Sequence, residues 1–117
     1  MIRGTTPTIT YRFPFETTAL TKIRIYFMQG NETLLTLREE DCVIEGNTVK
    51  VTLKEEETYA FNPKKRIDTQ VRFLTEDGTV GASKPKYIDV DEIAGEIEIL
   101  ADEDEQDEEQ SEEQIEA

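Results

Sequence analysis

The fold is decided by residues 48–74, which read TVKVTL (48–53), KEEETYAF (54–61), NPKK (62–65) and RIDTQVRFL (66–74). The first and last of these segments alternate apolar and polar residues, which is the period of a half-buried β-strand. The glutamate-rich segment between them predicts a short helical turn, with Thr52 and Glu55 spaced as a capping box; a solvated loop is the alternative. A connection of this kind places the two strands in different layers, so the stretch indicates a two-sheet β-sandwich.

The rest of the chain adds strands of the same kind. Two turn signals, Gly30-Asn31 and Asp77-Gly78, predict hairpins, since such residues tolerate positive φ. Pro85 interrupts the last strand and therefore favours an edge position there, with Ile88 and Val90 inward. The expected further strands are 8–13, 20–28, 33–37, 42–45, 80–83 and 86–90. About seven antiparallel strands at this spacing predict an all-β sandwich.

Charge divides the chain into parts. The whole chain has a net charge of −14, but residues 101–117 hold ten acidic residues and no basic one, which leaves 17 acids against 13 bases and a net charge of −4 for residues 1–100. A run of like charges with few apolar residues predicts disorder. We therefore expect a sandwich over 1–92, a linker or one extra strand over 93–100, and a disordered acidic tail over 101–117.

The residue types exclude most catalytic chemistry. The chain has no histidine, one cysteine and two serines, so no Ser-His-Asp arrangement and no thiolate or imidazole metal site can form. Its paired carboxylates lie in polar connections where solvation is the expected state, and Cys42 has no nearby cation in sequence to lower its pKa. We expect no catalytic residue, cofactor or metal, and a structural Cys42.

Two features are candidates for interaction. The segment 64–66 is the one basic cluster of the sequence, although a solvated loop before a strand is the favoured interpretation. The predicted strands 8–13 and 86–90 are expected to leave exposed sheet edges, which a partner can extend by adding a strand. The candidate interaction residues are Lys64, Lys65, Arg66, Thr10, Arg12, Lys86 and Asp89.

Several short motifs resemble a known group of proteins. The segments 1–8, 46–49, 52–56 and 77–79 resemble small proteins encoded among the structural genes of tailed phages and prophages of Gram-positive bacteria. The layout of residues 46–90 is also similar to the immunoglobulin-like N-terminal domain of phage baseplate upper proteins. The resemblance implies an immunoglobulin-like β-sandwich in a small accessory or adaptor component of a tail or baseplate. In immunoglobulin-like folds a tyrosine near this corner bonds back to the backbone, a role open to Tyr59.

These expectations converge on a non-enzymatic structural or interaction module of a phage virion. Its partner would be another virion protein, and a homo-oligomer is open; direct nucleic-acid binding is not expected at this charge, nor is a membrane span. The first seven residues lack an apolar signal core, which predicts folding in a bacterial host cytoplasm before any assembly into a virion. The alternative is a small acidic regulator that binds a basic protein and blocks nucleic-acid access.

Overall fold

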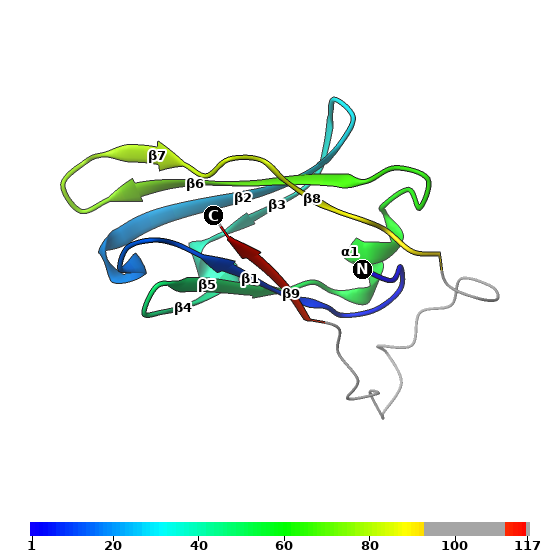
Figure 1. Ribbon diagram of the computed structural model, residues 1–117, viewed down its shortest axis with the longest axis horizontal. Helices are drawn as coiled ribbons and strands as arrows, with labels where there is room; N and C mark the ends of the chain where they lie inside the picture. The colour runs from blue at the N-terminus through cyan, green and yellow to red at the C-terminus, as the bar shows by residue number, and fades with distance from the viewer. Residues whose placement is uncertain (93–111, 117) are drawn as a thin grey trace.

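The computed structural model describes residues 1–92 and 112–116, and shows two β-sheets packed as layers (Figure 1). The first sheet has the strand order β4-β5-β1-β9, and the second has the order β3-β2-β6-β7, with β8 also paired to β6. The strands are β1 (Thr8–Arg12), β2 (Leu20–Gln29), β3 (Glu32–Arg38), β4 (Cys42–Glu45), β5 (Thr48–Thr52), β6 (Ile67–Thr75), β7 (Val80–Ala82), β8 (Lys86–Ile88) and β9 (Glu112–Glu116). The predicted all-β sandwich is confirmed.

Each sheet combines strands that are not consecutive in the chain. In the first sheet β5 lies between β4 and β1, and in the second β2 lies between β3 and β6. Consecutive strands therefore alternate between layers at β1–β2, β3–β4 and β5–β6. Short 3₁₀ turns, η1 (Thr17–Ala19) and η2 (Glu39–Asp41), make the first two of these crossings.

The stretch 48–74 crosses from one sheet to the other as predicted. Strand β5 belongs to the first sheet, β6 belongs to the second, and the helix α1 (Glu55–Tyr59) lies between them at one end of the sandwich (Figure 1). The predicted capping box is wrong. Thr52 still pairs with Thr8 in the β1–β5 ladder. The N-cap residue of the helix is Lys54, whose backbone N–H donates to Glu57 Oε1 at 2.7 Å.

The core lies between the sheets and is built from the inward face of each alternating strand. Ile23 of β2, Val51 of β5 and Val71 of β6 are almost completely buried, and Phe73 packs against the same cluster. One buried polar contact joins the layers, since the Tyr11 hydroxyl on β1 lies 2.7 Å from Thr69 Oγ1 on β6. Burial raises the pKa of Tyr11, so this hydroxyl keeps its proton.

Both predicted hairpins are present. Strands β2 and β3 pair in antiparallel fashion around Gly30, which has a φ of 63°. Strands β6 and β7 do the same around Gly78, at a φ of 88°. Positive φ of this kind favours glycine, which explains why a glycine occupies each turn.

The predicted edges are right for one strand and wrong for the other. Strands β7 and β8 lie along the same side of β6, separated at Pro85, and Ile88 and Val90 are buried as expected. Strand β1, in contrast, is an interior strand, because β5 pairs with one side of it and β9 with the other. The prediction that the segment 8–13 leaves an exposed edge is therefore wrong.

The acidic tail was expected to be disordered, and the structure differs at its end. Residues Glu112–Glu116 form β9, which runs parallel to β1 with Ile115 in register with Tyr11 (Figure 1). Ile115 is buried in the core cluster. The burial of Ile115 and the pairing with the edge of β1 thus hold in a strand a segment whose charge predicts disorder. The predicted linker or strand over 93–100 and the tail up to residue 111 lie outside the described residues.

The N-terminal segment is anchored at the α1 corner. Arg3 donates through Nη2 to the Tyr59 carbonyl at 2.8 Å, and its guanidinium lies 5.8 Å from the centroid of the Tyr59 ring. The hydroxyl buried at this corner belongs to Thr58, which accepts from the Gly4 N–H and donates to the Thr5 or Glu55 carbonyl. Thr58 thus ties the N-terminal segment to α1 through hydrogen bonds between its side chain and the backbone.

The layered core predicts a contrast between two neighbouring valines. Val51 on β5 is 1% exposed, whereas Val43 on β4 of the same sheet is 56% exposed. We expect Val51→Ala to lower the free energy of unfolding by about 2 kcal/mol, because it removes buried methyl groups and leaves a cavity. Val43→Ala should change it by less than about 0.5 kcal/mol. Urea unfolding followed by circular dichroism measures both, and equal losses would contradict the sandwich core.

The corner predicts a second contrast, between two glycines. Gly4 and Gly30 both have positive φ, 75° and 63°, but a Cβ on Gly4 would lie 2.6 Å from the Tyr59 ring, whereas nothing lies within 4 Å of one on Gly30. Both alanine substitutions carry the same backbone strain, about 1 kcal/mol. We expect Gly4→Ala to lower the unfolding free energy by a further ~1–3 kcal/mol through overpacking. The difference between the melting temperatures of the two variants measures the overpacking against Tyr59. Equal melting temperatures would contradict the packing of Gly4 against the Tyr59 ring.

Candidate functional site

The structure does not bring the predicted interaction residues together. Lys64, Lys65 and Arg66 are exposed in the loop between α1 and β6. The loop is held from within, because the Gln29 side-chain amide donates to the Asn62 and Lys65 carbonyls, both at 2.9 Å. The Arg66 guanidinium lies over the Tyr87 ring, 3.6 Å from its centroid. The hydrogen bonds from Gln29 and the contact between Arg66 and Tyr87 thus account for the conformation of this basic loop.

The residues predicted on the two edges lie in different sheets. Thr10 is 1% exposed on the interior strand β1, so it is not available to a partner, and Arg12 is half-buried at the end of the same strand. Lys86 is half-buried on β8, in register with the buried Thr69. A charged residue directed inward on an edge strand opposes edge-to-edge pairing. Asp89 is exposed, and its carbonyl accepts from the N-terminal ammonium at 2.9 Å.

A different set of cations meets on the outer face of the second sheet. Arg24 of β2 is in direct register with Arg38 of β3 on one side and with Arg72 of β6 on the other. Adjacent strands lie about 4.8 Å apart, so three guanidinium-bearing positions follow one another across the sheet. We call these three residues the arginine row.

Within the described residues, one member of the row is neutralised. Arg24 Nη1 donates to both carboxylate oxygens of Glu39, at 2.9 and 3.0 Å. This hydrogen bond holds the pKa of the Glu39 carboxyl below its usual range. Arg38 and Arg72 are exposed, and in residues 1–92 and 112–116 neither side chain forms an ion pair. Since like charges directly opposite one another destabilise a sheet, the row carries an electrostatic penalty.

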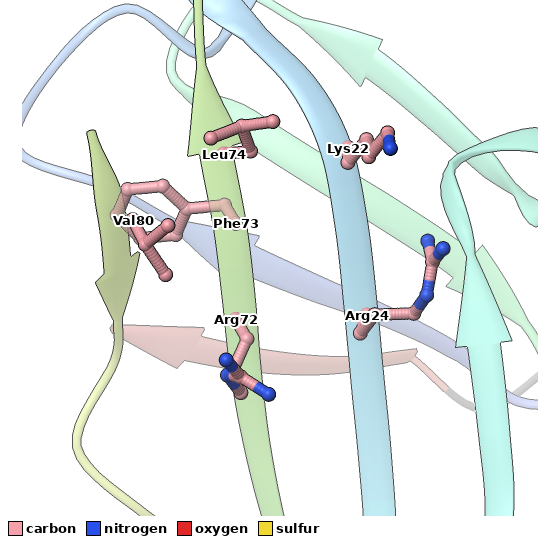
Figure 2. A pocket seen from close by; sticks show the side chains of 6 residues that line it. All are labelled: Lys22, Arg24, Arg72, Phe73, Leu74 and Val80. Carbon is pink, nitrogen blue, oxygen red and sulfur yellow. The ribbon is translucent and has the colours of Figure 1, made fainter. Parts of the chain in front are cut away.

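An apolar hollow borders the row. Figure 2 shows Lys22 and Arg24 on β2, Arg72 and Leu74 on β6, and Val80 on β7 around a shallow hollow of about 190 Å³. Lys22, Leu74 and Val80 form the next register row of the sheet, and Val80 is 63% exposed. Chemically, this surface offers guanidinium donors for carboxylates beside a patch that accepts an aliphatic side chain.

Three other kinds of site were considered for the described residues: a metal site, a reactive thiol and a membrane-spanning helix. Residues 1–92 and 112–116 contain no grouping of three or more His, Cys, Asp or Glu able to hold a metal ion. Burial and nearby carboxylates raise the pKa of Cys42 to about 12, and its thiol donates to the Arg38 carbonyl at 3.1 Å. In the same ranges no helix is long and apolar enough to cross a membrane.

Sequence reasoning missed the arginine row for a definite reason. Alternation in the sequence places Lys22, Arg24 and Arg72 on the outward faces of their strands, and the structure confirms those faces. Which residues lie side by side depends on the register between strands, which alternation leaves open. The hairpin at Gly30 does not supply this register, because the ladder shifts between Phe27 and Met28. The turn alone would set Arg24 opposite Leu37, and the shift sets it opposite Arg38.

Comparison of the sequence with models of known protein families and with curated proteins found no match.

The Arg24–Glu39 pair predicts a pH-dependent contribution to stability. Because the folded-state pKa of Glu39 is depressed, its stabilising effect is present above the pKa of the unfolded chain and is lost as the pH falls through the folded value. We expect Glu39→Gln to lower the urea midpoint at neutral pH and to have no effect in acid, where Glu39 is protonated. The exposed Glu45→Gln on β4 is the control. A difference that persists unchanged in acid would contradict the ion pair.

Proposed function

We propose that this protein is a non-enzymatic interaction module whose arginine row binds an acidic segment of another protein. The observation that carries the proposal is the register of Arg24, Arg38 and Arg72 across three adjacent strands, with Glu39 the one carboxylate paired to the row among the described residues. A row of uncompensated like charges destabilises the isolated sheet. A carboxylate-bearing partner would remove that penalty, and this makes the surface suited to binding.

A protein partner fits the surface better than nucleic acid. The chain as a whole has a net charge of −14, so its long-range field repels a polyanion of high charge density. The hollow beside the row is lined by Leu74 and Val80, which suit an aliphatic side chain. An acidic peptide segment with an interspersed Leu or Ile supplies both groups. The absence of histidine from the whole chain supports a binding role over a catalytic one.

The resemblance of short sequence motifs to phage structural proteins suggests a biological setting for this module. We propose that it is a small accessory or adaptor component of the tail or baseplate of a tailed phage or prophage. The acidic partner would then be another virion component, met in the host cytoplasm during assembly. The two-sheet sandwich supports this proposal, because folds of this type present broad sheet faces and edges to neighbouring proteins.

One observation favours a second candidate function. Residues 101–117 hold ten acidic residues and no base, which suits docking on a basic protein. In that case the chain would act as an acidic regulator that blocks nucleic-acid access. The two functions use opposite charges on different parts of the chain, so one pair of probes separates them.

A labelled peptide that repeats two glutamates and one leucine tests the first function. We expect Arg38→Ala and Arg72→Ala each to weaken its binding about 1.4- to fivefold, the range for exposed ion pairs worth ~0.2–1 kcal/mol. Lys50→Ala, an equal change of charge on β5 of the other sheet, is the matched control. Fluorescence anisotropy measures the affinities, and binding should weaken steeply when salt is raised to ~0.3 M.

Each outcome assigns the function. Equal effects of the two arginine variants and of Lys50→Ala would reject the arginine row as the site. A polylysine probe that binds the parent chain and fails to bind a chain in which the seven acids of residues 102–109 are replaced by their amides, with β9 kept, would support the acidic regulator instead. Both arginine variants must retain the urea midpoint of the parent chain for the affinities to be compared.

A further inference from the structure

Strand β9 differs from every other named strand of the described residues. It forms their one parallel ladder, pairing Glu112–Glu116 with Thr8–Arg12, while the other ladders are antiparallel. It is also the last described element of the chain, about 100 residues from its partner in sequence. Among the described residues, its position is set by the ladder with β1 and by the burial of Ile115 in the core cluster.

The contacts of β9 are specific although few. Ile115 is 8% exposed and joins the core cluster in register with the buried Tyr11. The ladder continues to the end of both strands, where Arg12 is the Cα partner of Glu116. With β9 in place, Thr10 in the middle of β1 is 1% exposed. Without it, β1 would present a strand edge beside an apolar inner face, a form of surface that readily takes an added strand.

The connection to β9 is long enough to reach another molecule. Residues 93–111, nineteen in number, join Glu92 to Glu112. A chain of that length spans at most about 65 Å when extended. The longest dimension of the protein is 49 Å. The strand can therefore reach the β1 edge of an adjacent copy as well as that of its own chain.

We propose that β9 is an exchangeable strand, which pairs with β1 of its own chain in the isolated protein and with β1 of a second copy when copies are held close together. The two arrangements make identical strand contacts, so their balance depends on concentration alone. Tethering through nineteen residues corresponds to an effective concentration of about 1 mM within one chain. Exchange should thus be rare in dilute solution and extensive where copies are arrayed at higher local concentration, linking them in pairs or in open chains.

Cysteines placed at register partners test the exchange directly. Thr10 and Gln114 are Cα partners across the β1–β9 ladder, and adjacent strands lie within the range that a disulfide bridges. In a chain whose single cysteine is replaced by Cys42→Ser, Thr10→Cys together with Gln114→Cys should oxidise to a bond within one molecule when dilute. Thr10 Oγ1 has no hydrogen-bond partner among the described residues, so its replacement is mild.

Two singly substituted chains then report exchange between molecules. A mixture of the Thr10→Cys chain and the Gln114→Cys chain, refolded together above ~1 mM, should form a disulfide-linked heterodimer identified by peptide mass. Glu113→Cys in place of Gln114→Cys is the matched control, because neighbouring residues of a strand face opposite sides. We expect at least about tenfold more heterodimer from the Gln114→Cys mixture than from this control.

The crosslinking results distinguish an exchanged β9 from one that stays on its own chain. A heterodimer that rises with concentration and exceeds the Glu113→Cys control establishes exchange. A bond that forms within the doubly substituted chain, with no heterodimer above the control at any concentration, means that β9 is fixed to its own chain and overturns the proposal. Failure of the doubly substituted chain to form the bond within one molecule would overturn it as well, since β9 would not pair with β1.

Discussion

The burial of apolar side chains between two sheets is the constraint on which the rest of this structure depends. Each long strand contributes alternate residues to that interior, such as Ile23, Val51 and Val71, and sends the others outward. Because side chains along a strand alternate strictly, fixing the inner face also fixes the outer one. The surface chemistry of both sheets therefore follows from the packing of the core, as does the crossing of the chain from β5 through α1 to β6.

The arginine row is one consequence of this rule. Once Ile23, Ile25 and Val71 face inward, Arg24 and Arg72 must face outward, and the antiparallel register sets them side by side with Arg38. Glu39 offsets part of the resulting repulsion. The remaining positive potential lies on a chain whose overall charge is strongly negative, and this contrast gives the outer face of the second sheet its proposed role in binding an acidic protein segment.

Strand β9 in the first sheet also follows from the burial of apolar side chains between the sheets. Strand β1 is buried on its inner face by Ile9 and Tyr11, and one of its sides would remain unpaired if β5 were its only neighbour. The C-terminal segment fills that position with one isoleucine and a ladder of backbone hydrogen bonds, although most of its residues are charged. Backbone pairing needs no particular side chain, which is why an acidic segment can complete the sheet.

The sequence by itself determined the class of fold, most strands and both hairpins, because alternation and turn chemistry are local properties. It placed Lys22, Arg24 and Arg72 on outward faces for the same reason. Only the tertiary structure decided that Arg24, Arg38 and Arg72 adjoin, that Thr10 is covered, and that Glu112–Glu116 pair with β1. These facts depend on register and on contacts between segments far apart in the chain, and local patterns carry no information about either.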